Sequence, residues 1–269
     1  MARLISFVIK SDFGFFKKPE INEVYLTYTI PPKPLILGIL GAILGLKGLK
    51  EQYYEKKSLP EYYEKLKDLK IGVTPLKDNF PFNKIMNKYN SRNSYFYTTE
   101  DGAENLPIIE QLIIKPSYKI FVYDPKSDNK IFSNLIKLLE KNQTIFIPYM
   151  GKNDFPLEID NFKEHASFEE MKEEIDNLLI NSIYVHNIKN SDEKKLYDGP
   201  RFVSFSGVPA INKPSLEFDF YENIPVAYNE NMLYRLETIR YTSKQIKKEE
   251  ISLEKSKLIK LNNHIIYVF

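Results

Sequence analysis

The chain has 269 residues, of which 43% are hydrophobic and 28% are charged, and its formal net charge at pH 7 is +2. This length and composition exclude a disordered or fibrous chain and allow one large or two modest hydrophobic cores. The lack of cysteine excludes disulfides and thiolate zinc sites and fits a reducing compartment, so we expect a cytoplasmic protein. The small net charge does not by itself indicate nucleic-acid binding, so local patterns must carry any such prediction.

The first two predicted elements are a strand over residues 3–10 and an apolar helix that follows the prolines at 31, 32 and 34. The apolar run from Leu35 to Leu46 has twelve residues, whereas a helix needs roughly 20 to cross a membrane. The run therefore predicts a buried helix, and no membrane partner is expected. Pro34 suits the first turn of this helix, and Gly48 is expected to end it.

Glycines at positions 38, 41, 45 and 48 share one face of the predicted helix, because their spacings are three, four and three. Each interior glycine costs roughly 1 kcal/mol relative to alanine, so Gly38, Gly41 and Gly45 together cost about 3 kcal/mol. A face without side chains allows close approach, either of another part of the chain or of a ligand backbone. The helix N-terminus with Lys33 beside it is also a candidate phosphate site, and the two interpretations are compatible.

Residues 47–70 form a charged segment, which we interpret as a solvated helical face, and residues 69–80 have strand character. The stretch 83–93 is polar and basic and is interpreted as a loop, whereas residues 94–99 alternate again. We expect a protruding hairpin around residues 80–107.

The strongest strand pattern covers residues 112–123 and is interrupted at Pro116. Asp128 is placed to cap a helix that has Ile131, Leu135, Leu138 and Leu139 on one face, and a strand over 144–149 is expected to follow. The order strand, helix, strand, strand, helix, strand predicts an α+β, ferredoxin-like domain over residues 1–156, the plan of an RRM.

The rest of the chain, residues 157–269, is predicted to be a smaller β-rich region. Ser167 and Glu170 have the spacing of a capping box and indicate one more helix. Alternating patterns separated by Gly, Pro and Asn then predict strands over residues 201–206, 216–221, 233–241 and 264–269.

Several motifs in the first 156 residues resemble a known family. They are Phe13-Gly-Phe-Phe-Lys-Lys-Pro-Glu, then Tyr28-Thr-Ile-Pro-Pro-Lys-Pro with the glycine-faced helix, then Ile114-Lys-Pro-Ser-Tyr-Lys-Ile-Phe-Val, and finally Pro148-Tyr-Met-Gly-Lys-Asn-Asp-Phe-Pro. In this order they resemble the Cas-five family of CRISPR-associated RAMP proteins. The remainder of the chain resembles the family only in its length and strand-rich character.

The resemblance implies an RRM-like fold and a place in a type I Cascade surveillance complex, and the character of the sequence resembles subtype I-B. Such a subunit holds the 5′ handle of the CRISPR RNA and contacts the backbone subunit and the large subunit. Target DNA would be contacted only indirectly, through the complex.

Gripping a single-stranded RNA requires cations for the phosphates and flat rings for the bases. For each of the residues chosen on this basis, a solvated or core role is the alternative. The predicted RNA-binding residues are Lys10, Lys17, Lys18, Lys33, Gly38, Gly41, Gly45, Arg92, Tyr95, Tyr97, Lys115, Tyr118, Lys152 and Asn153.

An enzymatic role is not predicted. A family branch of subtype I-C cleaves precursor RNA without metal, using tyrosine, lysine and histidine, but none of His165, His186 and His264 lies next to the Lys115 strand. His165 and His186 are expected to be structural. No nucleotide-binding, nucleophile-elbow or zinc motif is present, so no metal or cofactor is predicted. A metal-independent endoribonuclease and a purely structural scaffold subunit remain the two alternative functions.

Overall fold

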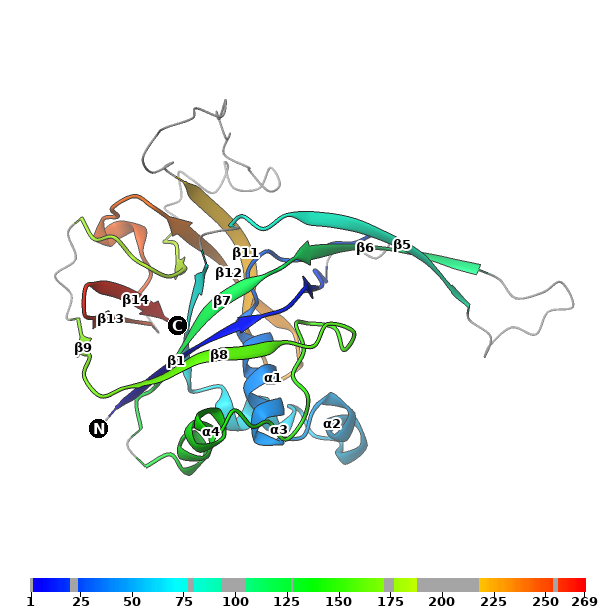
Figure 1. Cartoon of the computed structure of the whole chain (residues 1–269), viewed down its shortest axis with the longest axis horizontal. Coiled ribbons are helices and arrows are strands. Elements are labelled where there is room, and N and C mark those ends of the chain that lie inside the picture. The colour runs from blue at the N-terminus through cyan, green and yellow to red at the C-terminus, as the bar shows by residue number, and fades with distance from the viewer. Residues whose placement is uncertain are drawn as a thin grey trace, which may run out of the picture.

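The computed structural model describes residues 2–19, 24–76, 80–92, 105–126, 128–171, 177–187, 218–253 and 256–269. Within these residues the chain is a mixed α+β protein, rich in sheet and with few helices (Figure 1). None of the helices in the described part of the chain is long and apolar enough to span a membrane.

The central sheet has four strands, and two helices connect them along the chain. The sheet order is β4-β7-β1-β8, and all neighbouring strands are antiparallel. Helix α1 follows β1, and helix α4 lies between β7 and β8 in sequence. The bounds are β1 Arg3–Lys10, α1 Lys33–Leu44, β4 Lys70–Pro75, β7 Ser117–Asp124, α4 Lys130–Glu140 and β8 Glu158–His165. Two short helices, α2 Leu49–Glu55 and α3 Glu61–Leu66, lie between α1 and β4.

The two faces of this sheet have different cover, because successive residues of a strand point to opposite faces. Ile5, Phe7 and Ile9 of β1 belong to the main hydrophobic core, together with the apolar faces of α1 and α4. Leu4 and Tyr123 point the other way and pack in a smaller core against β13 (Lys257–Leu261) and β14 (His264–Val268). The helices therefore cover one face of the sheet, and the C-terminal hairpin covers part of the other.

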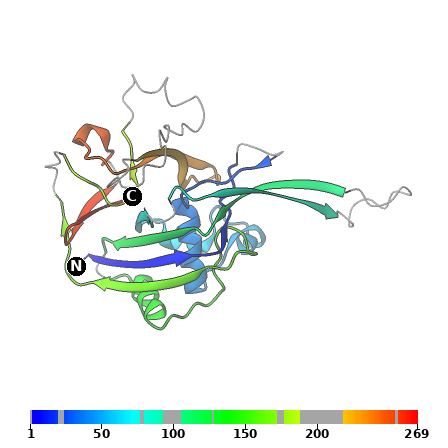
Figure 2. The same cartoon turned by 45° about the horizontal axis from the view of Figure 1, so that its top comes forward.

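A long hairpin projects from the body of the molecule (Figures 1 and 2). Its strands, β5 (Lys84–Arg92) and β6 (Asn105–Ile114), pair antiparallel from Lys84 opposite Ile113 to Arg92 opposite Asn105. The base of β6 also pairs with β2 (Phe13–Gly14) and, in parallel, with β3 (Val24–Tyr25). The interpretation of residues 83–93 as a loop was wrong, because polar side chains suit a hairpin that lies largely in solvent. Pro116 separates β6 from β7, as the sequence indicates.

The C-terminal part contributes two three-stranded sheets, of order β10-β12-β11 and β14-β13-β9. The additional strands are β9 Glu169–Glu170, β10 Tyr184–Val185, β11 Asp219–Tyr228 and β12 Tyr234–Thr242, and a 3₁₀ turn covers Lys248–Glu250. The predicted strands over 216–221, 233–241 and 264–269 correspond to β11, β12 and β14, whereas 201–206 lies outside the described residues. Phe269 exchanges two backbone hydrogen bonds with Ile71, so the end of the chain lies along β4.

The predicted strand over residues 144–149 is wrong, and the fourth strand of the sheet is β8. The amides of Ile145 and Phe146 instead donate to the carbonyls of Ile43 and Ala42, at 3.1 and 2.9 Å. Both carbonyls lie in the last turn of α1, where an α-helix leaves carbonyls without an i+4 donor. The carbonyl of Ala42 also accepts from the amide of Gly45 at 3.3 Å. The segment predicted as a strand thus caps the C-terminal end of α1.

Three predicted helix boundaries also differ. Helix α1 ends at Leu44 rather than near Gly48, because Gly45 adopts a left-handed φ of 72° and its amide bonds back to the helix. Asn129, not Asp128, caps α4, and its side chain accepts from the amides of Ile131 and Phe132. The capping box predicted at Ser167 and Glu170 was wrong, because Glu169–Glu170 form β9 and pair with β13.

The division of the chain into residues 1–156 and 157–269 stays a prediction. Strand β8 pairs with β1 and so joins the two parts in one sheet. The main hydrophobic core likewise contains residues from both parts.

Candidate nucleic-acid interface

Three of the sequence motifs meet at the base of the projecting hairpin. We call this place the motif junction and define it as residues 12–18, 114–118 and 148–156. The amide of Phe15 donates to the carbonyl of Met150 at 3.0 Å, and the amide of Lys115 donates to the carbonyl of Asp12 at 2.8 Å. The rings of Phe13 and Phe155 lie 5.8 Å apart. Segments separated by more than a hundred residues are thus joined by backbone bonds.

Two glycines make this close approach possible. Gly151 has a φ of 86°, and a Cβ at this position would lie 1.9 Å from the carbonyl oxygen of Phe15. A Cβ on Gly14 would lie 3.0 Å from Pro116 and 3.1 Å from Met150. Both the backbone conformation at Gly151 and the space around it therefore require glycine.

The segment that leads into α1 is anchored to the same junction. The amide of Tyr28 donates to the carbonyl of Phe16 at 2.9 Å, and the hydroxyl of Tyr118 donates to the carbonyl of Thr29 at 2.5 Å. Tyr118 is fully buried, with its ring against Phe16 and Phe82, and burial raises its pKa well above the ordinary value. We therefore assign Tyr118 to the core rather than to base stacking.

The junction presents several polar groups to solvent. Lys17 is exposed, and its ammonium lies 3.8 Å from the centre of the Tyr25 ring. Lys115 is exposed in the turn between β6 and β7, where its φ of 47° is left-handed and costs roughly 1–2 kcal/mol for a residue other than glycine. Asn153 is exposed in the turn after Gly151. These side chains can reach a phosphate without losing a buried partner.

Other predicted cations at the junction are paired with carboxylates. Lys152 contacts Glu110 of β6 at 3.0 Å, and the hydroxyl of Tyr89 donates to the same buried carboxylate at 3.0 Å. This group fixes the Gly151 turn to the hairpin, and it leaves Lys152 less available for a ligand. Lys18 lies 3.3 Å from Glu222 of β11.

Lys10, at the end of β1, is paired with two carboxylates of β8. Its ammonium lies 2.6 Å from Asp160 and 3.1 Å from Glu158. Hydrogen bonds to Asp160 and then to Glu158 raise the pKa of Lys10. Both pairs are substantially exposed, so they hold the lysine only weakly against a competing phosphate.

The glycine face of α1 is occupied by the chain itself. A Cβ on Gly41 would lie 2.5 Å from the Cβ of Tyr62 in α3, and one on Gly45 would lie 2.7 Å from Ile145. Gly38 has more space, since the closest atom, from Tyr62, would be at 3.9 Å. The close approach that the sequence predicts is therefore made by α3 and by the segment that follows α4.

The remaining predicted residues lie elsewhere. Tyr95 and Tyr97 fall outside the described residues, and only the backbone of Arg92 is described, at the end of β5. Lys33 lines a cavity beside β4 and β14, and none of the other predicted RNA-binding residues whose side chains the structure describes lines it.

Sequence reasoning missed three lysines. Lys84, at the start of β5, donates to the carbonyl of Thr27 at 3.2 Å, and burial lowers its pKa. Lys119 and Lys163 lie on the sheet face opposite α1 and α4, where burial and the neighbouring Lys163 lower the pKa of Lys119. The strand register of β7 predicts the face of Lys119, but only the pairing of β8 with β1 brings Lys163 beside it.

Two of the described histidines, His165 and His186, have side-chain partners within the fold. His165 lies 2.8 Å from the hydroxyl of Ser6, and burial, Lys119 and Lys163 lower its pKa. His186 contacts the carbonyl of Glu250 at 2.9 Å. Within the described ranges, no group of three or more His, Asp or Glu side chains could hold a metal ion.

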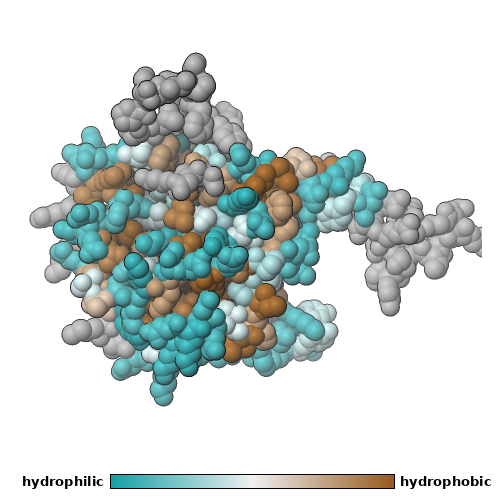
Figure 3. All heavy atoms as spheres, in the orientation of Figure 1, coloured by the Kyte–Doolittle hydropathy of each residue, from teal (hydrophilic) through white to brown (hydrophobic). Residues whose placement is uncertain are grey.

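Hydrophilic residues predominate on the projecting hairpin in the view of Figure 3.

Neither the known family models nor the curated proteins contain a match to this chain. The solved structures that are similar to it include CRISPR-associated proteins. One is a chain of a "CRISPR RNA-guided surveillance complex", with 10% identity, 89% of this chain and 90% of that chain covered, and a TM-score of 0.44. Another is a CRISPR protein from Archaeoglobus fulgidus, with 11% identity, 99% of both chains covered, and a TM-score of 0.42. TM-scores below 0.5 do not establish a common fold.

Proposed function

We propose that the chain is a non-catalytic CRISPR RNA-binding subunit of a type I Cascade surveillance complex, of subtype I-B, that holds the 5′ handle of the RNA. It would contact the backbone and large subunits in the cytoplasm and reach target DNA only through the complex. The observation that carries this proposal is the motif junction. The segments through which the sequence resembles the Cas-five family are joined there by backbone bonds, and exposed Lys17, Lys115 and Asn153 lie on their surface.

The proposed fold is ferredoxin-like, as in RRM and RAMP domains. The strands β1, β4, β7 and β8, numbered one to four in chain order, lie in the sheet order two, three, one, four. With α1 and α4 as the connecting helices, this order is that of a split βαβ plan. The hairpin β5–β6 is then an insertion between the second and third strands.

A single-stranded handle suits the chemistry of the junction. Exposed ammonium groups neutralise phosphates without base preference, and an exposed amide such as that of Asn153 can bond to a base edge or a ribose hydroxyl. The rigid backbone contacts at Gly151 and Gly14 would hold these groups at fixed positions, which lowers the entropic cost of binding.

The proposal of a non-catalytic role rests on the placement of the histidines. His165 is opposite Leu4 at one end of β1, whereas Ser117, two residues after Lys115, is opposite Lys10 at the other end. Six residues of strand separate these positions, a distance of about 20 Å. A general base in His165 and a cation in Lys115 would therefore not reach the same scissile phosphate.

The test is binding of handle RNA by the complex that contains this chain, measured across a salt series. We expect affinity to fall with salt, and the variant Lys17→Glu with Lys115→Glu to bind about tenfold or more weakly and with a shallower salt slope. The matched control is Lys137→Glu, on the exposed face of α4. Equal affinity of the double variant and the wild type would contradict the proposed site. Site-specific cleavage of a CRISPR repeat RNA by the purified chain in EDTA would contradict the non-catalytic role.

A further inference from the structure

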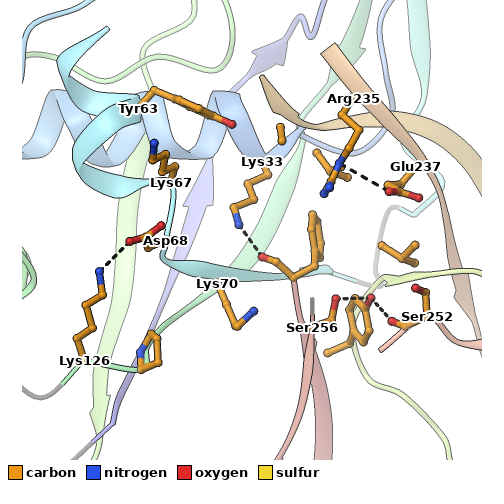
Figure 4. Close-up of a pocket in the computed structure, with 16 residues that line it drawn as sticks. Lys33, Tyr63, Lys67, Asp68, Lys70, Lys126, Arg235, Glu237, Ser252 and Ser256 are labelled. Carbon is orange, nitrogen blue, oxygen red and sulfur yellow. Dashed lines mark hydrogen bonds and ion pairs between the residues drawn. The ribbon is translucent and has the colours of Figure 1, made fainter. Parts of the chain in front are cut away.

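A cavity of about 470 Å³ lies where the β4 edge of the central sheet meets the C-terminal sheets (Figure 4). Its walls come from α1, α3, β4, β10, β11, β12 and β14, together with the turn after β7 and with Ser252 and Ser256. The volume is within the range of sites that hold small molecules in other proteins, which is roughly 300–1,000 Å³.

Among the charged side chains of the described residues that line this cavity, cations outnumber carboxylates. There are five cations, Lys33, Lys67, Lys70, Lys126 and Arg235, and two carboxylates, Asp68 and Glu237. Lys126 lies 2.7 Å from Asp68, and Arg235 lies 3.7 Å from Glu237. A full negative charge at the Phe269 oxygen that Lys33 contacts, at 2.9 Å, would still leave the cations in excess.

The cationic side chains come together from separate elements. Lys33 and Lys70 reach the cavity from α1 and β4, and Arg235 reaches it from β12 (Figure 4). Burial and then the charges of Lys70 and Arg235 lower the pKa of Lys33 to about 7, and Asp68 offsets this only in part. Burial also lowers the pKa of Lys70, with a further contribution from Lys257. Lys33 is thus a largely buried ammonium group near two further cations, and an anion that enters the cavity would stabilise its charged form.

We infer that this cavity binds a phosphate-class oxyanion, carried either by a free polyphosphate compound or by a nucleic-acid backbone. A phosphate group carries several charges in a small volume, which matches a small cavity with a surplus of cations. Arg235 offers a planar fork of donors to such a group, and Lys33 and Lys70 act as point charges. The tyrosines of the wall, Tyr63 and Tyr267, are buried and shape the cavity.

Binding of an anion in this cavity should also change the protonation of Lys33. An anion beside Lys33 favours its charged form, so binding near pH 8 should be accompanied by proton uptake at this lysine. The other charged groups that face it are Lys67, Asp68, Lys70, Lys126, Arg235 and Glu237. The inference does not depend on RNA binding at the motif junction.

The test is titration of inorganic tripolyphosphate into the purified full chain, followed by calorimetry and by thermal unfolding. We expect saturable binding, a rise in Tm, and at pH 8 a heat that changes with the ionisation enthalpy of the buffer. Lys33→Met should weaken binding at least tenfold and remove the buffer dependence. Arg235→Gln, a substitution at an exposed position, should also weaken binding if Lys33→Met fails to fold. Lys137→Met is the control and should bind as the wild type does.

Two outcomes would overturn the inference. One is the absence of binding by the wild type at millimolar tripolyphosphate, and the other is unchanged affinity in folded Lys33→Met or Arg235→Gln. Competition with handle RNA distinguishes the sources of phosphate. If tripolyphosphate displaces RNA from the wild type but not from Arg235→Gln, the cavity takes a backbone phosphate. If both ligands bind together, the cavity takes a free polyphosphate, and the proposed RNA site stands or fails separately.

Discussion

The motif junction and the cationic cavity are built on opposite plans. At the junction the contacts are between backbones, and the buried carboxylate of Glu110 is matched by Lys152 and Tyr89. In the cavity, side chains from separate elements gather, and among the described groups the cations exceed the carboxylates. Glycines and backbone hydrogen bonds thus make the junction rigid. In the cavity, the excess of cations lowers the stability of the fold. Substitutions at these two places should therefore change the free energy of unfolding in different ways.

The largest expected effect is at the junction, for Gly151→Ala. A Cβ there would lie 1.9 Å from the carbonyl oxygen of Phe15, and the φ of 86° is unfavourable for any residue with a side chain. We expect a loss of about 3 kcal/mol or more in the free energy of unfolding, measured by urea denaturation. The control is Gly48→Ala, because Gly48 is in extended backbone and a Cβ would meet only Glu51, at 4.0 Å. A loss at Gly151 no larger than that at Gly48 would contradict the account of the junction.

The glycine face of α1 should give a smaller effect whose sign depends on position. Gly41→Ala brings a Cβ within 2.5 Å of Tyr62, so we expect destabilisation by about 1–3 kcal/mol. At Gly38 the corresponding distance is 3.9 Å, and alanine should stabilise the helix by up to about 1 kcal/mol. Thermal unfolding of the two variants checks both signs. Equal effects at the two positions would show that α3 does not require the glycine face.

The effect expected at the cavity depends on pH. The pKa of Lys33 is lowered from 10.5 to about 7 in the folded chain. Below pH 7 both states carry the proton, so the cost of a buried charge close to other cations destabilises the folded state in full. Between pH 7 and 10.5 only the unfolded chain retains the proton, so raising the pH relieves this cost.

The variant Lys33→Met should therefore gain most over the wild type near pH 6, and the gain should shrink toward pH 10. Urea denaturation of both proteins at the two pH values measures the difference. The same comparison with Lys137→Met should show no such trend. A gain from Lys33→Met that does not vary with pH would mean that the pKa of Lys33 is not lowered in the folded chain.

The sequence predicted correctly those elements whose structure follows from the pattern of residues within the element itself. The alternation of β1 and the apolar run of α1 are of this kind, and both elements lie where expected. The pattern over 144–149 predicted a strand wrongly. The amides of Ile145 and Phe146 bond to the end of α1 instead of to a neighbouring strand, and the apolar side chains of this segment, such as that of Ile147, are exposed. The glycine spacing predicted close approach, but only tertiary contacts identify Tyr62 and Ile145 as the groups that approach.

The candidate site could be predicted only in part, for a related reason. The motifs around Phe13, Pro116 and Gly151 were recognisable in sequence, but their joining by backbone bonds is a property of the fold. Tyr118 has an aromatic ring that could stack on a base, but its position in β7 places this ring in the core. Of the cavity, the sequence indicated only Lys33, as a candidate phosphate site at the start of α1. Lys70 and Arg235 are far from it in the chain and come together with it only when the C-terminal sheets pack against β4.

The central claim, that RNA is held at the motif junction, is tested most directly by photocrosslinking. CRISPR RNA with 4-thiouridine in its 5′ handle would be assembled into the complex and irradiated, and the crosslinked peptides of this chain identified by mass spectrometry. We predict crosslinks within residues 12–18, 114–118 and 148–156 or along the hairpin β5–β6. Handle crosslinks confined to the C-terminal sheets or to other subunits would contradict the account.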